Sequence, residues 1–213
     1  MKRKVFAFLG DFYHEKSPLE AAVKKAFEKI EDVELTVSDN VADVLPKNPD
    51  LLVLGMENRV NPEDSEVFFW LMEELDHQLE DYVLNGGSLV VIHCGLASYP
   101  GDSKIRKMMK GEFISHPADH CDVRYFSENG RYDFSVKDEF YVVGVDVEET
   151  TVFLHSESVE YGRGLAGWYH MYGKGRVICV VPTHNAEGFA HDGVLNLYQD
   201  AFEWGLGGNE FGN

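Results

Sequence analysis

Leu89-Val90-Val91-Ile92, followed directly by His93, is the stretch that decides the fold of this chain. A short, continuous apolar run is typical of a strand covered on both faces, as the strands of parallel sheets are. A second such run spans residues 177–183 and is followed by His184. If both runs are parallel strands of one sheet, the two imidazoles emerge at its carboxyl edge, where open α/β sheets bind ligands.

Further strand patterns lie on either side of these runs. The first strand is expected at residues 4–9 and another buried strand at 50–55, while residues 33–37 alternate as a half-buried strand does. Shorter strands are expected in the second half of the chain, at residues 140–143, 151–154 and 165–170. Gly173-Lys174-Gly175-Arg176 predicts a hairpin turn before the last strand, because glycine supplies the positive φ that tight turns require.

Helix signals separate the strands. Ser17-Pro18 predicts a helix start, with serine as the cap and proline in the first position. Asn61-Pro62 gives a similar signal, and a buried stripe from Val67 to Val83 follows it. The expected helices therefore run from Ser17 to about Lys29, from Asn61 to Asn85-Gly86-Gly87, around Lys104 to Lys110, and from about Gly193 to Trp204.

The alternation of strands and helices predicts an α/β fold, a three-layer sandwich with a mostly parallel sheet. The length of 213 residues suits one domain over residues 1–213, since no repeat or linker divides the chain. Because parallel strands run in the same direction, the residues that follow them lie at the same edge of the sheet. A third histidine, His14, follows the first strand and is expected there too.

The composition excludes several classes of partner. A net charge of −18 repels phosphate backbones and anionic lipids, so nucleic acid and membrane partners are not expected. The apolar stretch near the start breaks at Gly10-Asp11, too early for a signal sequence or a membrane span. The three cysteines are an odd number without C-x-x-C spacing, which argues against disulfides and thiolate zinc clusters. We expect a cytoplasmic protein, for which a homo-oligomer is possible.

No nucleotide cofactor is predicted, although residues 162–167 match the G-x-G-x-x-G pattern. This motif binds a dinucleotide only where it joins a strand to the amino end of a helix. Here the segment continues into Trp168-Tyr169-His170, which has a strand pattern.

The nine histidines are the richest chemical signal in the sequence. Neutral imidazoles from His14, His93 and His184 could bind zinc or another divalent metal. Alternatively, His93 or His184 could act as a general base without a metal, since imidazole titrates near neutrality. Trp168 and Tyr169 could stack on a sugar ring, or pack at the rim of the pocket.

Cys94 offers a different chemistry. It follows a core strand at the position where many α/β enzymes hold a nucleophile, and His184 could serve as its base. However, Ile92 and Leu96 stand where a nucleophile elbow has small residues, which favours a buried, inert thiol.

Taken in order, the motifs resemble those of the trehalose-utilisation (ThuA-like) family. The matching pieces are Phe12-Tyr13-His14, the run from Gly86 to His93, Phe113-Ile114-Ser115-His116-Pro117, Asp138-Glu139-Phe140-Tyr141, the run from Trp168 to Val177, and Thr183-His184. The resemblance implies a variant of the class I glutamine amidotransferase-like, flavodoxin-related fold. It also implies a role in the utilisation of trehalose or related disaccharides and their keto derivatives.

The residues that the resemblance carries over are His14, His93, His116, Asp138, Glu139 and His184. We expect an enzyme acting on a carbohydrate, with His93, His184, Asp138 and Glu139 as catalytic candidates and His116 in the substrate pocket. Two alternatives stay open: a cysteine-dependent amidotransferase or hydrolase using Cys94 and His184, and a non-catalytic ligand sensor.

Overall fold

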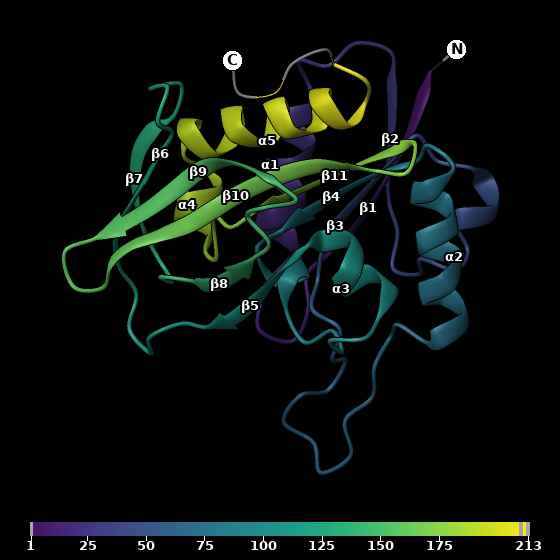
Figure 1. The fold of residues 1–213 in the computed structure, drawn as a ribbon, viewed down its shortest axis with the longest axis horizontal. Coiled ribbons are helices and arrows are strands. Elements are labelled where there is room, and N and C mark those ends of the chain that lie inside the picture. The colour runs from purple at the N-terminus through teal and green to yellow at the C-terminus, as the bar shows by residue number, and fades with distance from the viewer. Residues whose placement is uncertain (1, 209–210, 212–213) are drawn as a thin grey trace.

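The computed structural model describes residues 2–208 and residue 211. Its main sheet has nine strands in the order β2-β1-β3-β4-β11-β10-β9-β6-β7, and a second sheet pairs β5 with β8 (Figure 1). The strands are β1 (Arg3–Leu9), β2 (Val33–Val37), β3 (Leu51–Gly55), β4 (Ser88–Ile92), β5 (Gly111–Ser115), β6 (Cys121–Phe126), β7 (Asp133–Asp138), β8 (Val142–Val145), β9 (Thr151–Ser158), β10 (Gly162–Tyr172) and β11 (Gly175–Val180). The helices are α1 (Lys16–Phe27), α2 (Glu73–Leu84), α3 (Lys104–Met109), α4 (Ala186–Phe189) and α5 (Asp192–Gly205), with 3-10 turns at Leu45–Lys47 and His93–Leu96.

The two apolar runs that suggested the fold are adjacent parallel strands, β4 and β11, as expected. The other parallel strands lie beside them: β3 pairs with β4, β1 with β3, and β2 with β1. Every residue of β3 and of β4 is buried. Because these five strands run in the same direction, their carboxyl ends lie at one edge of the sheet.

The sheet is mixed, so the expectation of a mostly parallel sheet holds only for this half. β10 returns antiparallel to β11 through the hairpin predicted at residues 173–176, where Gly173 has a φ of +59°. β9, β6 and β7 continue the antiparallel pattern to the far edge. A hairpin turn can join only antiparallel strands, so the glycines at this turn set the direction of β10.

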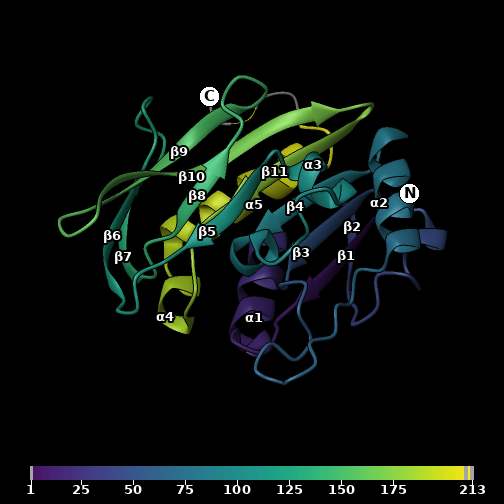
Figure 2. The same ribbon diagram turned by 60° about the horizontal axis from the view of Figure 1, so that its bottom comes forward.

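Helices cover both faces of the parallel half. α5 packs on β4 and β11 and also against α1, while α2 and α3 pack against each other and on β11. Figure 1 shows α5 on one side of the sheet and α3 on the other, and Figure 2 gives a second view of these layers. Helices therefore lie on both faces of the parallel strands. Among the described residues, no helix has the length and apolar character needed to cross a bilayer.

The predicted start of the second helix at Asn61 was wrong, because α2 begins only at Glu73. The side chain of Asn61 does not cap a helix: its Oδ1 accepts from the backbone N–H of Phe68 and its Nδ2 donates to the carbonyl of Glu66. These bonds close a loop that projects at the bottom of Figure 1. The local amide therefore competes with the helix for backbone groups.

The second half of the chain also differs from the sequence pattern. The strand expected at residues 140–143 starts at Val142 and pairs with β5, outside the main sheet. β6 and β7 were not expected, although buried and exposed residues alternate along both strands as they do in half-buried strands. α1 starts at Lys16 without a side-chain cap, so Ser17 is not its N-cap.

At Gly95 the turn after β4 passes very close to the backbone at the end of β3. A Cβ atom at Gly95 would lie 2.3 Å from the carbonyl oxygen of Leu54, which is backbone and cannot rotate away. The absence of a side chain at Gly95 therefore lets the turn that begins with His93 lie against β3.

We predict that Gly95→Ala lowers the free energy of unfolding by about 1–3 kcal/mol, because overpacking against rigid backbone costs this much. Urea unfolding followed by circular dichroism measures the change. The matched control is Gly101→Ala, since nothing lies within 4 Å of a Cβ atom there. Equal effects of the two substitutions would contradict the steric argument.

Candidate metal centre

Three histidines from distant segments meet at the carboxyl edge of the parallel strands. His14 lies between β1 and α1, His93 follows β4, and His184 follows β11. The ring centroid of His14 is 5.1 Å from that of His93 and 4.7 Å from that of His184. The centroids of His93 and His184 are 5.7 Å apart. The structure therefore brings together the three imidazoles that sequence analysis placed at one edge.

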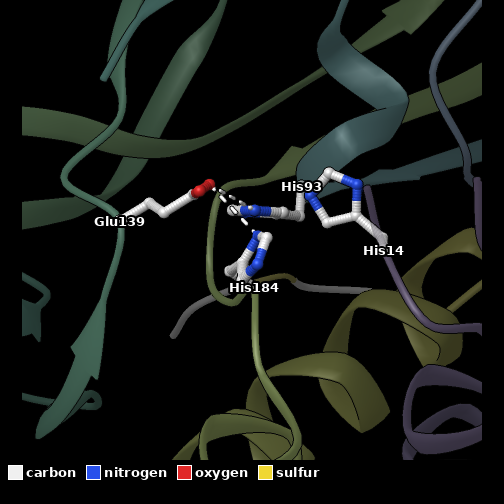
Figure 3. A group of neighbouring side chains, drawn as sticks. All are labelled: His14, His93, Glu139 and His184. Carbon is white, nitrogen blue, oxygen red and sulfur yellow. Dashed lines mark ion pairs between the residues drawn. The ribbon is translucent and has the colours of Figure 1, made fainter. Parts of the chain in front are cut away.

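Glu139 completes this group from the opposite side (Figure 3). It lies in the connection between β7 and β8, and its Oε2 is 3.2 Å from Nδ1 of His184 and 3.4 Å from Nε2 of His93. One ligand atom from each of His14, His93, Glu139 and His184 falls within a set whose members are all within 4.8 Å of one another. We call these four residues the buried cluster.

The ring nitrogens that face the centre have no hydrogen-bond partner. Nε2 of His14, Nε2 of His93 and Nδ1 of His184 are all buried and unpaired. A buried polar atom without a partner typically costs about 1–3 kcal/mol, so three in one place are unusual.

The outer nitrogens of two rings are fixed by neighbouring oxygens. Nδ1 of His93 donates to the carbonyl of Val181 at 2.7 Å, and Nδ1 of His14 is 2.7 Å from Oδ1 of Asp11. A carbonyl can only accept, so the proton of neutral His93 is on Nδ1 and its Nε2 carries a lone pair. The same protonation of His14 follows from the carboxylate acceptor. Carboxylates and carbonyls orient metal-binding imidazoles in this way.

The turn after β4 presents His93 and not Cys94. His93 has a φ of +44°, a left-handed conformation that is costly for a residue with a side chain. Cys94 is only 1% exposed, and burial raises the pKa of its thiol, with the carboxylate of Asp11 adding to the shift. A protonated, inaccessible thiol is a poor nucleophile, so this geometry does not favour the cysteine-dependent alternative.

Asp138 contributes by holding the backbone near the cluster. It is completely buried, and its carboxylate accepts from Tyr125 Oη at 2.7 Å and from the backbone N–H groups of Glu139 and His184 at 3.0 and 2.9 Å. Because it fixes two members of the buried cluster, Asp138 is a positioning residue.

Two more histidines face the other oxygen of Glu139. Nε2 of His116 is 3.6 Å and Nε2 of His120 is 3.7 Å from Oε1. Both side chains are about a third exposed. The structure thus places His116 next to the cluster on its outer side and adds His120.

Trp168 and Tyr169 lie away from this group, and their expected place in the substrate pocket was wrong. Trp168 is fully buried, and its Nε1 donates to the carbonyl of Met109. Successive residues of a strand point to opposite faces, and Tyr169 packs against Trp204 and Phe211. Among the described residues, no ring contact joins Trp168 or Tyr169 to the buried cluster.

The charges within the cluster depend on one another. Burial by itself raises the pKa of Glu139, but the nearby imidazoles of His184 and His93 outweigh it and lower the pKa well below the ordinary range. The same carboxylate raises the pKa of His184, while burial lowers the pKa of His14. Glu139 is therefore an anion at neutral pH.

Sequence analysis missed Asp11 and gave no role to His120. Asp11 accepts from the N–H groups of Tyr13, His14 and Glu57 in addition to facing the imidazole of His14. The available signal was an acid directly after a strand, three residues before a candidate ligand. His120 had no such signal, because it is close to Glu139 only through the tertiary fold.

Comparison with known proteins gives one sequence family and a set of shared folds. The family model described as ThuA, trehalose utilisation, matches residues 4–205. No curated protein matches the chain. A ThuA-like protein from Parabacteroides merdae is similar in structure, with a TM-score of 0.75 and 14% identity over 98% of this chain and 91% of that one.

Two further solved structures share the fold. A ThuA-like protein from Bacteroides uniformis has a TM-score of 0.68 and 16% identity over 95% of this chain and 90% of that one. A GH42 β-galactosidase from G. stearothermophilus has a TM-score of 0.65 and 18% identity over 96% of this chain but only 30% of its own. At these identities the likeness concerns the fold alone.

We predict that only Cys121 reacts rapidly with a thiol reagent in the folded protein. Cys94 and Cys179 are buried and burial raises the pKa of both, whereas Cys121 is partly exposed. Titration of the folded protein with Ellman's reagent should give one fast-reacting thiol. The Cys121→Ser variant should give none, and the native protein in denaturant should give all three thiols. Rapid labelling of Cys94 would revive the nucleophile alternative.

We also predict that Glu139→Gln lowers the pKa of His184 in chelator-treated protein, as measured by histidine NMR titration. The Glu139 carboxylate raises this pKa above 6.5, so it stabilises the folded state below pH 6.5 and less as pH rises through the folded pKa. Removing the charge should remove this part of the pH dependence of unfolding. An unchanged His184 pKa would show that the pair does not form.

Proposed function

This chain belongs to the ThuA trehalose-utilisation family, and we propose that it is an enzyme that acts on a sugar at a divalent-metal centre. His14, His93, Glu139 and His184 would hold the metal. The single observation that carries the proposal is the set of three unpaired, buried ring nitrogens facing one carboxylate.

The donor set fits a divalent transition metal. Imidazole nitrogen suits zinc, iron, copper and nickel, and a carboxylate oxygen adds a charged ligand. A bound cation would give the three nitrogens the partner that they lack within the protein. It would also supply Lewis-acid charge able to polarise a hydroxyl or carbonyl oxygen of a sugar.

Buried negative charge gives independent support. Asp11, Asp138 and Glu139 are all close to the cluster, and none forms an ion pair with a lysine or arginine among the described residues. Leaving buried carboxylates without countercharge is unfavourable. A divalent cation would compensate this charge, whereas imidazoles can do so only when they are protonated.

The residues of the chain have separable roles in this proposal. Asp11 and the carbonyl of Val181 fix the tautomers of His14 and His93, and Asp138 fixes the backbones of Glu139 and His184. His116 and His120 are on the exposed side, where a substrate hydroxyl could exchange a proton with an imidazole.

A carbohydrate substrate is supported by the family description and by the rim beside His14. Phe12 and Tyr13, which directly precede His14, are 54% and 46% exposed. Exposed aromatic rings offer an apolar face on which a sugar ring can stack. They take the role that sequence analysis gave to Trp168 and Tyr169.

Metal analysis of protein purified without a histidine tag tests the proposal. We expect at least one tightly bound divalent ion per chain, and its loss in His93→Ala. Asp11→Asn should weaken the binding about 10–100-fold, the usual effect of removing an orienting partner. His77→Ala is the matched control, because His77 is exposed on α2. Absence of bound metal after addition of zinc, manganese or cobalt would contradict the metal centre.

Incubation with trehalose and a keto derivative of it tests the enzymatic part. The metal-loaded protein should convert one of these or a related disaccharide, as followed by mass spectrometry, and His93→Ala should not. Thermal stabilisation by a sugar without conversion would favour the sensor alternative instead.

A further inference from the structure

The two oxygens of Glu139 face two different pairs of histidines. Oε2 faces the inner pair His93 and His184, whereas Oε1 faces the more exposed pair His116 and His120. Four imidazoles therefore surround one carboxylate, two on each oxygen. A carboxylate that bridges two cations has this distribution of neighbours.

The outer pair is oriented by the same device as the inner one. Nδ1 of His116 donates to the carbonyl of Pro117 at 2.7 Å, so in the neutral ring Nε2 carries the lone pair. This nitrogen faces Oε1 of Glu139. Two atoms with lone pairs do not attract each other, whereas both are ligands for a cation between them.

The ring of His116 is also held in place by an aromatic stack. The ring of Tyr141 is nearly parallel to those of His93 and His116, and its centroid is 4.1 Å from the first and 5.9 Å from the second. The interplanar angles are 24° and 16°. Tyr141 is buried, so it links a residue of the buried cluster to the outer pair through a rigid contact.

We infer that His116, His120 and Glu139 form a second divalent-cation site, next to the buried cluster and sharing Glu139 with it. The inference rests on the proposed function, because the bridging carboxylate belongs to both sites. Three protein ligands on an exposed side leave positions for water or substrate oxygens. Metal ions in such paired sites typically lie about 3.5–4 Å apart and bind two oxygens of one substrate.

The net charge near Glu139 supports the second ion. Asp11, Asp138 and Glu139 carry more negative charge than one divalent cation neutralises. The whole chain has a net charge of −18, so a second cation is also attracted by the long-range field. Imidazole ligands favour zinc and cobalt over calcium and magnesium, which prefer oxygen, while the bridging carboxylate also suits manganese.

Cobalt titration of the full-length, chelator-treated protein without a tag tests this inference. Wild-type protein should bind two equivalents of Co²⁺, and the double variant His116→Ala/His120→Ala should bind one, with the visible spectrum of the first equivalent retained. His77→Ala should still bind two. Both substituted side chains are partly exposed, and circular dichroism checks that the variant folds.

Manganese gives a second readout that a purely structural role of the outer histidines would not move. The second equivalent of Mn²⁺ should broaden the electron paramagnetic resonance signal of the first, because ions that share a carboxylate are magnetically coupled. The double variant should lose this coupling.

The outcomes separate the two proposals. A single equivalent in wild-type protein, or two in the double variant, would overturn the second site and leave the buried metal centre standing. No equivalent in wild-type protein would overturn both.

Discussion

The carboxylate of Glu139, buried among imidazoles, is the interaction on which the architecture of the site depends. An anion removed from water must be compensated, and within the described part of the chain only histidines face it. The histidines in turn have unpaired nitrogens at the centre. The group is therefore incomplete as a hydrogen-bond network, and a bound cation would complete it.

The fold supplies this arrangement through two different kinds of element. The parallel strands bring His14, His93 and His184 to one edge, and the strained turn at His93 aims its ring across that edge. Glu139 comes from the antiparallel half, where Asp138 ties it to the backbone of His184. Neither half contains all four residues of the buried cluster, so the cluster depends on both halves of the mixed sheet.

Sequence reasoning succeeded where local pattern and chain direction are sufficient. Continuous apolar runs identified β4 and β11, and a glycine-rich turn identified the hairpin before β11. It failed where side chains compete for backbone groups, as Asn61 does in its loop. It also failed for Trp168, because an aromatic residue near a motif can be fully buried, and a strand pattern does not say which face meets solvent.

The sequence by itself determined the parallel strands, the family, and the edge at which three histidines end, because apolar runs and strand polarity are local properties. Only the tertiary structure decided which groups share a centre. The pairing of β6, β7 and β9 carries Glu139 to the opposite side of the three histidines, and the connection from β5 to β6 carries His116 and His120 to its outer oxygen. Such contacts depend on long-range pairing, which residue spacing does not encode.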